Sequence, residues 1–214
     1  MKRCAKIFSA VLISLVVAGL ILEFSPDKKV VGVDISHNND LNADDWAKIG
    51  EEAEFLYLKV SEGGTYKDPM RLKNYRKAKK HSLHVGAYHF FRDNVDAKKQ
   101  FDNFKDAVKD IPELTLIPCI DYEKDGFRVG LKERINNLRE LNELFTQEYG
   151  HPPVIYCNLL DYATVKGFCP DNPYWICFNS PALGVGIIKQ EQREINGKVI
   201  DFNKLTSIED ILLH

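Results

Sequence analysis

Residues 114–123 read LTLIPCIDYE, an apolar run that stops at two carboxylic acids, Asp121 and Glu123. On an extended strand this spacing places both acids on one face, about 6.7 Å apart along the chain. Two carboxylates that close resist ionising together, so one should keep its proton to a higher pH. The stretch therefore predicts either a general-acid pair or only the polar end of a buried strand, because 31 Asp and Glu in 214 residues produce such pairs by chance.

Similar strand-like runs flank this stretch, at residues 30–36, 55–61, 84–91 and 152–158. Helix-like segments follow the five runs, at residues 44–53, 69–81, 97–110, 131–150 and 159–167. Beyond residue 170 the gaps between runs become too short for helices, and three more strands are expected at 174–179, 186–192 and 198–203. Five β-α units and three strands predict an α/β fold, a TIM-like (β/α)5(β)3 barrel in one domain, with an open doubly wound sheet as the alternative.

Most of these runs begin with apolar residues and end with polar ones. In a parallel barrel all strand C-termini share one rim, which is where active sites form. Four acids at or near strand ends are therefore expected to meet on that rim: Asp34, Asp121, Glu123 and Asp201.

Composition limits the partners and cofactors. The formal net charge of −2 gives no electrostatic reason to expect a nucleic acid partner. No CxxC pair or Cys/His spacing suggests zinc, so neither a metal nor a cofactor is expected. Cys119 and Cys157 lie inside apolar strand-like runs and are expected to be small buried residues.

The N-terminus has the pattern of a leader. Lys2, Arg3 and Lys6 precede an uncharged apolar run from Ile7 to Leu22. We therefore expect residues 1–27 to be a signal peptide or an N-terminal membrane anchor, with residues 7–24 in the membrane in the second case. Residues 28–214 would then be one extracytoplasmic domain, secreted, periplasmic or anchored, that meets the membrane through the leader alone. A monomer is expected.

Seven stretches resemble, in order, motifs of the glycoside hydrolase family 25 lysozymes: GVDISHNND, YLKVSEGGTYKDP, VGAYHFFR, IDYE, PPVIYCN, YWICF and VIDFN. The resemblance runs from about residue 31 to 205. It implies a flattened barrel of five β-α units and three strands. It also implies a peptidoglycan hydrolase that cleaves the β-1,4 bond between N-acetylmuramic acid and N-acetylglucosamine, so that glycan strands are the expected partner.

The resemblance also assigns roles to residues. Glu123 matches the family's proton donor and Asp121 its partner in D-x-E, which would stabilise or orient the substrate acetamido group. Asp34 and Asp201 match the acids of the first and last strands. Candidates for substrate binding complete the site: Tyr88, Tyr156, Trp175 and His37. For His37 and His89, a structural hydrogen-bonded role is favoured over that of a catalytic base.

The chain also departs from the family pattern. The HNND stretch lacks the usual glycine, and the strand IKQEQRE lacks the aromatic residues of the usual Trp-Gln-Tyr. A non-catalytic peptidoglycan-binding module on the same scaffold is therefore the alternative function. A metal-dependent polysaccharide hydrolase or deacetylase that uses the acids with His37 and His89 is a third.

Overall fold

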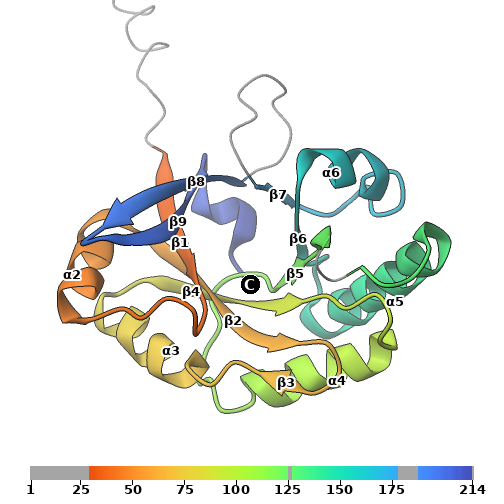
Figure 1. The fold of residues 1–214 in the computed structure, drawn as a ribbon, viewed down its shortest axis with the longest axis horizontal. Helices are drawn as coiled ribbons and strands as arrows, with labels where there is room; N and C mark the ends of the chain where they lie inside the picture. Colours follow the sequence, from red (N-terminus) through yellow and green to blue (C-terminus); the bar gives the residue numbers. More distant parts are fainter. Residues whose placement is uncertain (1–28, 125–126, 178–187, 214) are drawn as a thin grey trace, which may run out of the picture.

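Eight strands form a barrel, and helices cover its outer face (Figure 1). The computed structural model describes residues 29–124, 127–177 and 188–213, so the predicted leader, residues 1–27, lies outside the described part. Strands β1 (Val30–Ile35), β2 (Phe55–Glu62), β4 (His84–Phe90), β5 (Cys119–Asp121), β6 (Val154–Cys157), β7 (Tyr174–Ile176) and β8 (Ile188–Ile195) are parallel. Strand β9 (Lys198–Leu205) is antiparallel to both β8 and β1.

The strand pairing closes the ring. Strand β1 pairs with β9 on one side and with β2 on the other, so each barrel strand has two neighbours. A short additional strand, β3 (Tyr66–Lys67), pairs with the end of β2 in a hairpin that the sequence pattern does not predict. The closed order confirms the expected (β/α)5(β)3 barrel and contradicts the open doubly wound alternative.

The helices occupy the expected gaps: α2 (Ala43–Glu52), α3 (Arg71–Lys80), α4 (Ala97–Val108), α5 (Leu131–Tyr149) and α6 (Leu159–Val165). Helix α2 starts with a capping box, in which the Asn42 side chain accepts from the Asp45 backbone and the Asp45 side chain accepts from the Asn42 backbone. Helix α5 ends at Gly150, whose φ of 74° lies in the left-handed region that favours glycine. Local sequence signals therefore set these helix ends.

Helices α4 and α5 pack against each other through aromatic residues. The ring centroid of Phe145 lies 4.7 Å from that of Phe104 and 5.3 Å from that of Phe101. These residues belong to the apolar stripes that the helical spacing predicts, and all three are buried. The outer core thus forms between the helices and the sheet.

A second core fills the barrel. The ring of Tyr57 lies 5.2 Å from that of Trp175 and 6.3 Å from that of Phe55. Two glycines on neighbouring strands make room for these rings, because a Cβ on Gly32 would lie 2.4 Å from Phe55 and one on Gly86 would lie 2.4 Å from Tyr57. The barrel is therefore a packed core and its open site lies at one end.

The predicted strand at residues 114–123 is much shorter than expected. Strand β5 covers only Cys119–Asp121, and Glu123 lies two residues beyond its end. Pro118 has no N–H to donate to a sheet ladder, and the residues before it run under the barrel instead. There Leu116 pairs with Leu212, and the Ile117 N–H donates to the carbonyl of Ile211 at 2.8 Å.

The C-terminal segment closes the base of the barrel. After β9, the 3-10 helix η2 (Ile208–Ile211) places the fully buried side chain of Ile211 in the inner core. The Leu213 N–H then donates to the carbonyl of Thr115 at 3.0 Å. Figure 1 shows this segment in dark blue across the middle of the ring.

Candidate active site

The strand ends opposite this base surround a pocket of about 220 Å³. Seven of the eight predicted site residues line it: Asp34, Asp121, Glu123, Asp201, Tyr88, Tyr156 and Trp175. They come from strands β1, β4, β5, β6, β7 and β9 and from the residues just after β5. Strand closure therefore brings together residues that are up to 167 positions apart in the chain, because Asp34 and Asp201 are register partners.

Asp34 lies near the end of β1 and accepts hydrogen bonds from two amide side chains. Asn203 Nδ2 donates to its Oδ2 at 2.8 Å, and Gln190 Nε2 approaches the same oxygen at 3.4 Å. Burial and the neighbouring charge of Asp201 raise the pKa of Asp34 to about 8, against the opposing effect of the two amides. Below that pH Asp34 is mainly a neutral carboxylic acid, which can donate a hydrogen bond.

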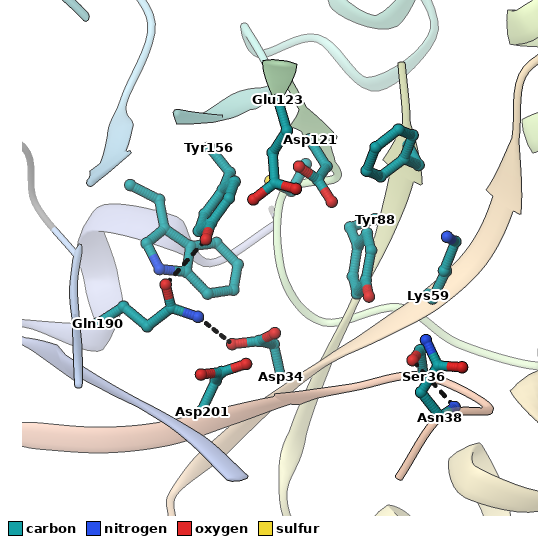
Figure 2. A pocket seen from close by; sticks show the side chains of 13 residues that line it. Asp34, Ser36, Asn38, Lys59, Tyr88, Asp121, Glu123, Tyr156, Gln190 and Asp201 are labelled. Carbon is teal, nitrogen blue, oxygen red and sulfur yellow. Dashed lines mark hydrogen bonds between the residues drawn. The ribbon is translucent and has the colours of Figure 1, made fainter. Parts of the chain in front are cut away.

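Asp121 and Glu123 direct their carboxyl groups into the pocket beside one another (Figure 2). Burial, and next the negative charge of Glu123, raise the pKa of Asp121 well above its usual range. Its Oδ1 is buried without a hydrogen-bond partner among the described residues. Because the two acids interact, their protons belong to the pair as a whole, and one proton is retained at a pH where an isolated carboxyl group has lost it.

Asp201 lines the pocket, but the strand that carries it runs in the direction opposite to the expected one. It is the fourth residue of β9, which runs antiparallel to the neighbouring strands, so the C-terminal end of β9 points to the base. The prediction that Asp201 closes a parallel strand is therefore wrong, although the residue still lies opposite Asp34. Burial raises the pKa of Asp201, while a hydrogen bond from Gln192 lowers it.

Two aromatic residues form one wall of the pocket. The Tyr156 and Trp175 rings meet edge to face, with centroids 5.1 Å apart. The Tyr156 hydroxyl donates to Gln190 Oε1 at 2.8 Å, which links this wall to Asp34 through Gln190. Trp175 Nε1 is buried without a partner in the described part of the chain.

His37, the eighth predicted residue, does not line this pocket. It lies in the turn after β1, and its Nδ1 is 2.9 Å from the carboxylate of the buried Asp68. His89 is also outside the pocket lining, hydrogen-bonded to Ser61 and Gln100 in the core. Burial lowers the pKa of His89 to about 4, so it is neutral at pH 7. These contacts support the structural role that was favoured over a catalytic one for both histidines.

The pocket contains residues to which the sequence analysis gave no role: Lys59, Gln190, Ser36, Asn38, Phe90 and Cys119. Lys59 had a recognisable signal, since a lysine two positions after Tyr57 in an apolar strand must face the barrel interior. Gln190 and Asn203 are also buried polar residues at inward positions of their strands. A search for polar residues at inward strand positions would have found them too.

The rim pocket of this closed barrel holds a carboxyl pair, two further acids and an aromatic wall. These are the groups that a hydrolase acting on sugars uses. Residues 33–179 match the sequence pattern of the glycosyl hydrolases family 25. The chain belongs to this family and is a glycosidase. The match ends before β8, so the residues of β8 and β9 around Asp34 lie outside it.

Solved structures agree with this assignment. A family 25 glycosyl hydrolase from Bacillus anthracis is 26% identical over 85% of this chain and 90% of its own, with a TM-score of 0.72. A muramidase from Trichobolus zukalii is 23% identical, with 85% and 95% covered and a TM-score of 0.69. A lysozyme from Streptomyces coelicolor is 22% identical, with 83% and 92% covered and a TM-score of 0.70. Among curated proteins, none matches the chain significantly.

Two further findings concern membranes and metals. Within the described ranges, no helix is both long and apolar enough to cross a membrane. In the same part of the chain, no three His, Cys, Asp or Glu side chains are grouped so that they could hold a metal ion.

Proposed function

We propose that this glycosidase hydrolyses the β-1,4 bond between N-acetylmuramic acid and N-acetylglucosamine in peptidoglycan. The observation that carries the proposal is the Asp121 and Glu123 pair, directed into a rim pocket of a family 25 barrel. The names of two structural neighbours, a muramidase and a lysozyme, favour peptidoglycan as the substrate class. Such an enzyme acts on the cell wall outside the cytoplasm.

Glu123 is proposed as the general acid. It lies beyond the end of β5, and its carboxyl group is directed into the pocket (Figure 2). Glycoside hydrolysis needs an acid that protonates the leaving oxygen while positive charge develops on the sugar ring. The carboxyl pair retains a proton because burial and mutual repulsion disfavour its double ionisation, and in the productive state this proton is on Glu123.

Asp121 is proposed to orient the acetamido group of the substrate. The acetamido oxygen attacks the anomeric carbon, the bond to the leaving oxygen breaks, and Glu123 gives that oxygen its proton. Water then attacks the same carbon, the acetamido group is released, and Glu123 takes a proton back from the water. Asp121, whose side chain lines the pocket, accepts the N–H of the acetamido group and stabilises the positive charge that it acquires.

Asp34, Asp201 and the aromatic wall complete the proposed site. A neutral Asp34 donates a hydrogen bond without adding negative charge next to the reacting pair. Tyr156 and Trp175 line the pocket and offer aromatic surface to a sugar. Membership of a glycosidase family, together with four retained acids, favours this enzyme over the non-catalytic binding module that the missing aromatics suggested.

The test is the substitution Glu123→Gln in the full chain. Glutamine keeps the shape of the side chain but cannot donate an acidic proton, so we expect a loss of activity of about 100-fold or more. The assay digests purified peptidoglycan and identifies the new reducing ends by mass spectrometry. The parent should release fragments that end in reducing N-acetylmuramic acid.

The matched control is Glu133→Gln, which removes an exposed carboxylate from the first turn of α5. It should digest peptidoglycan as the parent does. If Glu123→Gln also cleaved at the parental rate, the assignment of the acid would be wrong. Fragments that end in reducing N-acetylglucosamine would place the cleaved bond on the other side of the sugar.

A further inference from the structure

Two basic residues lie close together at the pocket, Lys59 within β2 and Arg92 just after the end of β4. Lys59 Nζ is 2.7 Å from Glu62 Oε2, and Arg92 Nη2 is 2.5 Å from Glu62 Oε1. Both cations also face the ring of Phe90, with Lys59 Nζ 4.8 Å and the Arg92 guanidinium carbon 4.7 Å from its centroid. We call these four residues the cationic cluster.

The cationic cluster has an excess of positive charge. Two cations share one carboxylate, so the cluster has a net charge of +1 with every member in its usual ionisation state. The side chains are only partly exposed, 11% for Lys59, 23% for Glu62 and 27% for Arg92, so water screens this charge less than it would at the open surface. An anion that reaches the cluster would meet the positive charge of two cations that Glu62 and Phe90 hold in place.

The cluster reaches the catalytic pocket through Lys59 and Phe90, whereas Glu62 and Arg92 are not among the lining residues. Lys59 and Phe90 line the pocket together with the four acids, and Lys59 is the one cation among the described lining residues. In Figure 2 the ring of Tyr88 separates Lys59 from Asp34 and Asp201. The pocket therefore has a negative end and a positive end.

We propose that Lys59 and Arg92 bind a carboxylate that the glycan substrate carries. The inference rests on the proposed function, because peptidoglycan is a glycan with an acid on every second sugar. That acid is the lactyl carboxylate of N-acetylmuramic acid or, where a stem peptide is attached, a carboxylate of the peptide. The negative end repels such a group and the positive end attracts it, so the cluster fixes the direction in which a glycan strand lies in the pocket.

The test measures affinity in Glu123→Gln, so that no glycan is cut and the result does not depend on catalysis. Three glycans serve as probes: strands stripped of stem peptides, the same strands with the lactyl carboxylates converted to amides, and intact strands with their peptides. We expect the stripped strands to bind about fivefold more tightly than the amidated ones, as a charge-assisted contact at a partly exposed site predicts. In the double variant that carries both Glu123→Gln and Arg92→Gln, this preference should disappear.

Two further variants separate recognition from structure. Arg92→Lys keeps the charge and should keep most of the preference. Lys98→Gln, which removes an exposed cation from α4, should leave the preference unchanged. Equal affinity of the Glu123→Gln protein for all three glycans would overturn the proposal, as would an equal loss of affinity for all of them in Arg92→Gln.

The probes also identify the source of the carboxylate. Tighter binding of stripped strands than of amidated ones assigns the lactyl group. A preference confined to intact strands, and lost in Arg92→Gln, assigns the stem peptide. Failure of the parent to release reducing ends would instead count against the proposed muramidase activity, while the affinities would still decide the role of the cluster.

Discussion

The folded protein keeps the carboxyl group of Asp34 protonated near neutral pH, and this lowers the free energy of unfolding. Burial and the nearby Asp201 raise its pKa to about 8, whereas its value in an unfolded chain is near 3.8. Between these two pH values the folded protein holds a proton that the unfolded chain releases. Stability therefore falls as the pH rises through this window, because ionisation of Asp34 favours the unfolded state.

The substitution Asp34→Asn should remove this cost. Asparagine stays neutral at every pH, and its amide oxygen can still accept from Asn203 and Gln190. At pH 8 we expect Asp34→Asn to be more stable than the parent by on the order of 1–3 kcal/mol, with the difference vanishing near pH 4. Urea unfolding at both pH values measures it.

The control for this prediction is Asp110→Asn, which changes an exposed carboxyl group beyond the end of α4. That variant should match the parent at both pH values. A stability difference for Asp34→Asn that is the same at pH 4 and pH 8 would show that the ionisation of Asp34 is not its cause.

Single residues show how far the sequence predicts the site. Asp121 and Glu123 were found from their position after an apolar run, and the structure places both in the pocket. The environment of Asp34 was not predicted, because Gln190 and Asn203 act through a contact across strands that no local pattern records. His37 was selected as a substrate-binding candidate, but Asp68, 31 positions along the chain, holds it outside the pocket lining.

At the scale of elements, the closure of the barrel depends on the absence of side chains at two points. Gly32 pairs with Phe55, and Gly86 pairs with Tyr57, on neighbouring parallel strands. Each glycine lies against an aromatic ring that fills the barrel, so even a methyl group would collide with it. The choice of glycine here is steric and not a matter of backbone conformation.

We expect Gly32→Ala to lower the free energy of unfolding by about 1–3 kcal/mol, the usual cost of an overpacked core. The test combines this variant with Phe55→Leu, which shortens the colliding side chain. In the Phe55→Leu background the alanine should cost less than half as much. Equal costs in both backgrounds, measured by urea unfolding, would show that the collision with Phe55 is not the cause.

The elements themselves were predicted well where periodicity is strong. Helix α5 was expected at residues 131–150 and covers Leu131–Tyr149, since its apolar stripe and Gly150 mark both its face and its end. Strand β5 was expected at 114–123 and covers three residues, because an apolar run has the same pattern inside a sheet or under it. The run alone could not show that Leu116 pairs with the far end of the chain.

At the scale of the whole molecule, the two ends of the barrel have different tasks. The rim holds the polar pocket, whereas η2 and the run before β5 cover the base with apolar side chains. Ile211 is fully buried there among residues of several strands. The base should therefore contribute to stability without taking part in the reaction.

We expect Ile211→Ala to lower the free energy of unfolding by about 2–5 kcal/mol, the range for large-to-small substitutions in a core. The KM for peptidoglycan should stay at the parental value under conditions in which the variant is folded. Urea unfolding and steady-state kinetics give the two numbers. A changed KM with unchanged stability would mean that the base is coupled to the pocket.

Strands β8 and β9 form one continuous hairpin, residues 188–205, whose tip is tied to α2 because Asp45 accepts from Asn196 and Lys198. This stretch supplies Gln190, Asn203 and Asp201, which act together with burial on the pKa of Asp34. Asp121 and Glu123 come from a different part of the chain. Replacing the hairpin would therefore change the surroundings of Asp34 directly, whereas Asp121 and Glu123 would stay in place and feel the change only through charge.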